Sequence, residues 1–111
     1  MLDIAKLNWS AGFFEGEGTL RINRGRAGSH STMGFQIINC DLSALERFRA
    51  GVAGIGDIGG PYGPYGVSKK KTYCWRANRF RDVNALKGLL YPLLSSRRQQ
   101  QIIDHHNIVK T

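Results

Sequence analysis

The sequence has no long apolar run, few acidic residues and only two cysteines. No apolar segment approaches the roughly 20 residues that a helix needs to cross a bilayer, and Met1 to Trp9 contain no hydrophobic signal core. We therefore expect an intracellular protein without a membrane partner. Cys40 and Cys74 have neither a CxxC spacing nor a nearby histidine, which favours reduced thiols over a disulfide or a metal site.

Basic residues outnumber the acidic ones. The chain has 16 Lys and Arg against 8 Asp and Glu, which gives a formal charge of +8 at pH 7. This surplus exceeds what solubility requires and predicts a polyanionic partner. The basic residues stand among Thr, Asn, Gln and Tyr in strand-like segments, which favours nucleic acid over a membrane surface. The alternative is a basic protein whose charges are simply solvated.

The length limits how the protein can be organised. With 111 residues, of which 41% are hydrophobic, we expect a single domain over residues 1–111 with a modest core. There is no room for a binding domain and a separate catalytic domain. One surface must therefore perform both tasks.

Hydrophobic periodicity predicts the order helix, hairpin, helix, hairpin, helix. The expected elements are a helix over 3–16, strands over 19–24 and 32–39, a helix from 41 that ends near 54–56, a strand around 58, a strand over 70–80, and a helix over 82–101 with a helical continuation to 111. Asp3 and Asp41 are placed as N-caps, and Pro92 marks a kink or a break. The fold class is therefore α+β, an αββαββα domain whose four-stranded antiparallel sheet carries helices on one face. The other face is free for a ligand.

The end of the first helix carries the most specific motif. Residues 10–18, Ser-Ala-Gly-Phe-Phe-Glu-Gly-Glu-Gly, resemble the LAGLIDADG motif of homing endonucleases, and they precede a hairpin as in that family. Asn8, Gly12 and Gly16 also recur every four residues, so two copies of the helix can pack closely. Because glycine costs a helix roughly 1 kcal/mol, we expect a packing benefit in return. The alternative is that the two glycines only mark a fraying helix end.

The resemblance implies a homodimer, with Asn8, Gly12 and Gly16 at the interface of paired motif helices. It also implies that Glu17 binds the catalytic divalent cation, Mg²⁺ or another, with the Gly16 carbonyl as an additional ligand. The commoner residue at the Glu17 position is Asp, but Glu is also a hard oxygen ligand. Glu15 matches an acidic position that is not the principal ligand. The alternative for Glu17 is a solvated acid in a turn.

Two further positions correspond to catalytic residues of the family. Asn39 falls at the end of the second strand, where the family often has a polar residue that positions water. Arg97 stands where the family usually has a Lys beside the scissile phosphate. Arginine can stabilise negative charge but stays protonated, so it cannot act as a base. The alternative for Arg97 is a basic residue that only favours the helix dipole.

Strand parity predicts which side chains face DNA. Residues such as Leu20, Phe35 and Trp75 should point to the core, and their neighbours should point outward. Arg, Gln and Asn can pair with base edges in the major groove, and hairpin loops can contact phosphates. The predicted DNA-binding residues are Thr19, Arg21, Asn23, Arg24, Arg26, His30, Thr32, Gln36, Lys70, Thr72, Arg76 and Asn78. The alternative is a sheet whose polar face is only solvated.

Together these expectations describe a homodimeric, metal-dependent endonuclease that cuts double-stranded DNA at a palindromic or near-palindromic target. No small-molecule substrate is expected. The rival hypothesis is a non-catalytic nucleic-acid binder of the same fold, either an intron-splicing cofactor or a DNA-binding regulator. Arg97 in place of Lys keeps this rival open. A basic structural protein that binds nucleic acid without preference is a third possibility.

Overall fold

The computed structural model describes residues 2–23, 31–64 and 70–110. Helices alternate with pairs of strands along the chain, as the sequence predicts. The elements are α1 (Ile4–Glu17), β1 (Gly18–Asn23), β2 (Thr32–Asn39), α2 (Leu42–Gly51), β3 (Asp57–Tyr62), β4 (Thr72–Ala77), α3 (Phe80–Leu90), the 3-10 turn η1 (Tyr91–Leu93) and α4 (Ser96–Lys110). The predicted α+β class is confirmed.

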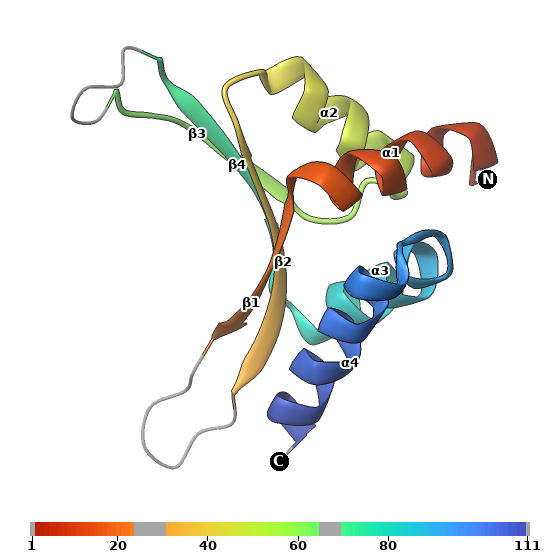
Figure 1. Ribbon diagram of the computed structural model, residues 1–111. Helices are drawn as coiled ribbons and strands as arrows, with labels where there is room; N and C mark the ends of the chain where they lie inside the picture. The colour runs from red at the N-terminus through yellow and green to blue at the C-terminus, as the bar shows by residue number, and fades with distance from the viewer. Residues whose placement is uncertain (1, 24–30, 65–69, 111) are drawn as a thin grey trace.

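The sheet has the strand order β1-β2-β4-β3, and every neighbouring pair is antiparallel. All the helices lie on one side of it, and the opposite face is bare (Figure 1). β2 and β4 are the central strands. The predicted sheet with helices on one face is therefore confirmed.

The predicted third helix is in fact two helices. α3 ends at Leu90, η1 contains Pro92, and α4 begins only at Ser96. Proline has no N–H for a helical hydrogen bond and clashes with the preceding turn, so the chain breaks there and does not merely kink. α4 then runs back along β1 and β2 (Figure 1). The predicted αββαββα order therefore gains one helix.

Other predicted boundaries also differ from the structure. The last strand ends at Ala77 and not at residue 80, because Phe80 opens α3 with its side chain 82% exposed. α2 ends at Gly51, before the predicted 54–56. Gly54, at a φ of 73°, follows in the turn, where its N–H donates to the Arg49 carbonyl. Glycine adopts this left-handed conformation without steric cost.

Both predicted N-caps are confirmed. The Asp3 carboxylate accepts from the Lys6 N–H at 3.1 Å. The Asp41 carboxylate accepts from the N–H of Ser43 at 3.0 Å and from that of Ala44 at 3.3 Å. The hydrogen bond from the Ser43 hydroxyl is the main cause that holds the pKa of Asp41 below its ordinary value, and the two backbone hydrogen bonds add to it. The caps fix where α1 and α2 begin.

Aromatic rings form the centre of the core. Phe14, Phe35, Phe48 and Trp75 are fully buried, and the Phe48 and Trp75 rings meet edge to face with centroids 4.6 Å apart. Such pairs contribute roughly 0.5–1.5 kcal/mol beyond the burial of their area. The Trp75 indole N–H donates to the Ile55 carbonyl at 2.9 Å, so it is satisfied. This packing fixes the C-terminal end of α1 against the sheet.

α1 and α2 cross closely because Gly51 has no side chain. A Cβ there would overlap the buried Ser10 hydroxyl and lie 2.6 Å from the Lys6 carbonyl oxygen. Ser10 instead donates to the Phe48 carbonyl at 3.0 Å. Among the described helices, none combines the length and the apolar character needed to span a membrane.

Candidate active site and DNA-binding face

The face of the sheet that no helix covers carries the side chains that the alternation along the strands predicts to point outward. Phe35 and Trp75 are buried on the helix side, whereas Arg21 and Arg76 are exposed on the other. The register aligns Thr19 with Gln36, Gln36 with Arg76, and Arg76 with Asp57, which makes one outward row across four strands. The predicted parity is confirmed.

Cross-strand hydrogen bonds order part of this face. Arg21 donates to the Gln36 side-chain oxygen at 2.9 Å, and Asn23 donates to that of Asn78 at 3.3 Å. Gly34 lies beneath the second pair, where a Cβ would overlap the Asn78 side chain. Within the described part of the chain, Arg76 has no hydrogen-bond or ion-pair partner. Its guanidinium is therefore available to an external group.

Nine of the predicted DNA-binding residues belong to the described part of the chain. Eight lie on the outward face of the sheet: Thr19, Arg21, Asn23, Thr32, Gln36, Thr72, Arg76 and Asn78. Lys70 precedes β4 and is exposed. The predictions for Arg24, Arg26 and His30 fall outside the described residues.

Glu17 is the last residue of α1 and is exposed. Among the described residues it makes no hydrogen bond or ion pair. Because the helix ends there, the carbonyl of exposed Gly16 has no helical N–H one turn later. A free carboxylate and a backbone carbonyl are hard oxygen donors, which fit a divalent cation such as Mg²⁺. No group of three or more His, Cys, Asp and Glu that could hold a metal occurs within the described ranges.

Arg98 fixes the backbone on both sides of Glu17. Its side chain donates to the Glu15 carbonyl at 3.1 and 3.2 Å and to the Gly18 carbonyl at 2.7 Å. Only 8% of the residue is exposed, and this burial is the main cause that lowers the pKa of its guanidinium. An arginine stays protonated despite such a shift. The turn that carries Glu17 is therefore held by a buried cation.

Glu15 is engaged in holding α4. Its carboxylate accepts from the Ser95 N–H at 2.7 Å and from the Ser95 hydroxyl at 2.9 Å. The backbone hydrogen bond from Ser95 is the main cause that lowers the pKa of Glu15, and Arg98 and Arg97 add to it. The two acids of the motif thus differ in their surroundings, since Glu15 is bound internally and Glu17 is free.

The structure brings the other two predicted catalytic residues to the same junction. Arg97 lies 3.6 Å from the Glu15 carboxylate, with its side chain 65% exposed. Asn39 follows, by two positions, the Ile37 that pairs with Gly18. Its side-chain oxygen accepts from the Asp41 N–H at 2.8 Å, which leaves its NH₂ group as a donor.

Sequence reasoning missed the roles of Arg98 and Ser95. A signal was present, because Leu94, Arg98 and Ile102 are spaced by four residues and are all buried. A cation in an apolar stripe of this kind indicates an internal partner.

The helix face predicted to dimerise is open. Asn8, Gly12 and Gly16 are exposed on α1. A Cβ built on either glycine would meet no atom within 4 Å. Ile4 precedes Asn8 by four residues and is also exposed. Within the described residues, the space beside both glycines of the stripe is therefore open.

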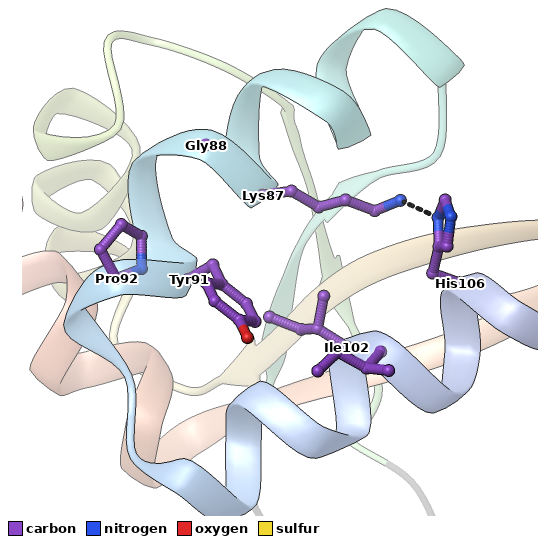
Figure 2. A pocket seen from close by; sticks show the side chains of 7 residues that line it. Lys87, Gly88, Tyr91, Pro92, Ile102 and His106 are labelled. Carbon is purple, nitrogen blue, oxygen red and sulfur yellow. Dashed lines mark hydrogen bonds between the residues drawn. The ribbon is translucent and has the colours of Figure 1, made fainter.

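A hollow of about 380 Å³ between α3 and α4 lies on the helix side, away from the bare sheet face. Figure 2 shows Lys87 reaching across it to His106, with Tyr91 and Ile102 lining it. The Lys87 Nζ lies 3.1 Å from His106 Nδ1. Burial lowers the pKa of Lys87. Neither group is near the junction of α1 and β1.

Several solved structures share this architecture. I-TnaI, a homing endonuclease, superposes with a TM-score of 0.71 over 93% of this chain and 70% of its own, at 17% identity. The LAGLIDADG homing endonuclease I-GzeII, solved with its DNA target, gives 0.70 over 94% of this chain and 35% of its own, at 16% identity. The chain has the LAGLIDADG homing endonuclease fold.

The intron-encoded homing endonuclease I-CeuI, complexed with DNA, also has this fold. It superposes with a TM-score of 0.68 over 99% of this chain, at 13% identity. The chain spans 35% of the length of I-GzeII and 56% of that of I-CeuI. No family model and no curated protein matches the sequence. In this LAGLIDADG fold, motif residues 10–18 close α1 and lead into β1.

Proposed function

We propose that the chain is one subunit of a homodimeric, metal-dependent endonuclease that cuts double-stranded DNA at a palindromic or near-palindromic target. The observation that carries this proposal is Glu17. Its carboxylate is exposed and has no partner among the residues that the structure describes, on a turn that the buried Arg98 holds on both sides. A carboxylate with only a structural role needs no such support.

DNA binding is supported by charge and by the sheet. The chain carries a net charge of +8, and Arg21, Gln36 and Arg76 stand on a bare face. A twisted two-stranded ribbon fits the major groove, where Arg and Gln can pair with base edges. Solved structures of the same fold include complexes with DNA.

Glu17 and the Gly16 carbonyl would hold Mg²⁺ or another divalent cation. When bound, such a metal activates water and neutralises charge on phosphate oxygens. Glu17 would bind this metal, Arg98 fixes the turn that carries Glu17, and the Asn39 NH₂ group could hold a water molecule. Arg97 can stabilise charge on the phosphate. Its contact with Glu15 is a partly exposed ion pair, which is weak enough for a phosphate to compete with it.

The proposed dimer follows from the number of strands to be cut. One chain supplies one Glu17, whereas two DNA strands require two such sites. Packing of the Asn8, Gly12 and Gly16 stripe against its copy places two α1 ends, and so two Glu17 residues, near one two-fold axis. Each subunit then reads one half of the target, which makes the target palindromic or nearly so.

One observation favours the rival function. Arg97 stands where the resemblance expects a Lys, and in the structure it pairs with Glu15. A non-catalytic splicing cofactor or DNA-binding regulator would tolerate this arrangement.

The test is a selection of cut sites from a random duplex library, with purified protein in Mg²⁺ and in EDTA. We expect enrichment of one near-palindromic site in Mg²⁺ and none in EDTA. A parallel selection for bound duplexes identifies a binder. Enrichment of bound DNA without cleavage at any divalent metal concentration would establish the rival.

A further inference from the structure

One end of the DNA-facing sheet is apolar. Ile38 lies on the outward face of β2, near the end of the sheet where β1 begins at Gly18, and is 54% exposed. It pairs directly with Cys74 of β4, and Tyr62 of β3 lies alongside, 38% exposed. Cys74 is buried and forms the floor. This feature escapes a search for polar DNA-reading residues.

These side chains line a shallow hollow of about 360 Å³. The wall is completed by three polar residues, Gln36, Thr72 and Arg76. An isolated exposed aliphatic residue needs no explanation, but here two exposed apolar side chains adjoin within a basic face. The guanidinium and the amide at its rim suit a polyanion, which argues against an apolar protein partner.

We propose that this apolar hollow, defined by Ile38, Tyr62 and Cys74, receives the methyl group of a thymine. The inference rests on the proposed binding of DNA. In the major groove the edges of adenine, guanine and cytosine present only hydrogen-bonding groups, whereas thymine adds a C5-methyl. An aliphatic side chain set among polar ones therefore selects thymine. The Gln36 oxygen accepts from Arg21, so the Gln36 NH₂ group and the Arg76 guanidinium are the groups available to contact neighbouring bases or phosphates.

The register places this thymine close to the cleavage site. Gly18, the first residue of β1, pairs with Ile37, so Ile38 is the next residue along β2, and Glu17, the last residue of α1, directly precedes Gly18. Arg21 and Asn23 lie farther along β1, toward the tip of the hairpin. The thymine is thus an inner base of each half-site, and the two-fold axis repeats it at the mirrored position.

The experiment compares duplexes with and without the methyl group. A site selected by the wild-type protein is synthesised with each thymine replaced in turn by deoxyuridine, and affinity is measured by fluorescence anisotropy in Ca²⁺. For one mirrored pair of thymines we expect the affinity to fall about fourfold for each methyl group removed. This factor corresponds to the free energy of burying one methyl group. Ile38→Ala should bind thymine and uracil equally at that position, and Ile38→Val should keep most of the difference.

The matched control is Ile103→Ala, which removes a partly exposed aliphatic side chain from α4 on the helix side. It should keep the full uracil penalty, and thermal melting verifies that both variants fold. The inference is overturned if no uracil position weakens binding, or if Ile38→Ala keeps the penalty. Binding without cleavage would overturn only the endonuclease proposal, whereas absence of any selected site would overturn both.

Discussion

At the scale of single residues, the two acids of the motif, Glu15 and Glu17, differ in their hydrogen bonds. Glu15 gives both carboxylate oxygens to Ser95 and so fixes the start of α4. Glu17 gives none within the described chain and points its charge outward. One acid therefore stabilises the junction, and the other is available for chemistry.

This division predicts the effect of Glu17→Gln. The change keeps the size of the side chain and removes its charge, so cleavage should fall by at least about a hundredfold while binding is kept or tightened. Cleavage in Mg²⁺ and binding in Ca²⁺, both on the selected site, measure the two effects. The control is Glu15→Gln, which should retain most of the cleavage under conditions where it is folded. A Glu17→Gln protein that cuts at near the wild-type rate would disprove the catalytic assignment.

The surroundings of Glu15 predict a pH-dependent stability. Its folded pKa lies below the ordinary value of 4.5, mainly because of the Ser95 hydrogen bond. A depressed carboxyl pKa contributes stability that is present above the ordinary pKa and is lost as the pH falls through the folded one. In urea unfolding, Glu15→Gln should therefore be less stable than wild type at pH 7, and the gap should narrow below pH 4.5. A gap that is constant with pH would show that the charge of Glu15 contributes nothing.

How much of the site could be predicted depends on the residue. The motif and the strand pattern predict Glu17, Asn39 and Arg97; in the structure Arg97 contacts Glu15 of the motif, Asn39 lies two residues beyond the partner of Gly18, and the catalytic roles stay predictions. Arg98 could not be predicted, because its role depends on the carbonyls of Glu15 and Gly18, some 80 residues away. Strand parity also puts Ile38 on the outward face, but its aliphatic side chain does not belong to the polar residue types that pair with base edges.

At the scale of elements, α1 has one end that carries the proposed site and one side that is exposed. Its final turn carries Glu17, and the stripe of Asn8, Gly12 and Gly16 faces open space. The side opposite the stripe packs into the core through Leu7, Ala11 and Phe14. The helix is thus anchored on one side and available for pairing on the other.

This openness predicts the effect of Gly12→Leu. In the described part of one subunit a Cβ at position 12 meets no atom within 4 Å, so folding should be unharmed, and helix propensity should improve by up to about 1 kcal/mol. Between subunits it should force the helices apart, which would leave monomers that do not cut. Sedimentation equilibrium and the cleavage assay measure these effects. Gly88→Leu in α3, another position with no atom within 4 Å, is the matched control and should remain dimeric. Wild-type protein that sediments as a monomer, both free and on its target, would exclude the proposed interface.

Elements could be predicted from the sequence where the interactions that define them join residues close together in the chain. Caps at Asp3 and Asp41 and the alternation along β2 are local, so the sequence predicted them correctly. The separation of α3 from α4 was harder to foresee. Pro92 accounts for the break, but the return of α4 along β1 and β2 is secured by contacts with Glu15 and Gly18, which no local pattern encodes.

At the scale of the whole molecule, charge and shape act together. The net charge of +8 is carried by a protein whose sheet is covered on one side only. The covered side holds the core, so the bare side is where a long polyanion can lie. Phosphate contacts from such a surface fix orientation, and base contacts provide the selectivity.

This arrangement predicts a steep dependence of DNA affinity on salt. Each phosphate contact releases counterions, so the logarithm of affinity should fall by about 0.9 per contact against the logarithm of salt concentration. Arg76→Ala should flatten that slope by about one if the residue binds phosphate. If it binds a base edge, the slope should stay and selectivity at one mirrored position should weaken. Titrations at several salt concentrations decide between the two, and an affinity that is independent of salt would exclude the polyanion hypothesis.

The hydrogen bond from Arg98 to Gly18 spans 80 residues of sequence. A ribosome synthesises about 5–20 residues per second, so roughly 4–16 seconds separate the appearance of the two partners. Throughout that interval the turn with Glu17 exists without the guanidinium that holds it. If the chain is the proposed endonuclease, the growing polypeptide is therefore inactive. It can cut DNA only after α4 has been synthesised and has packed against the turn that carries Glu17.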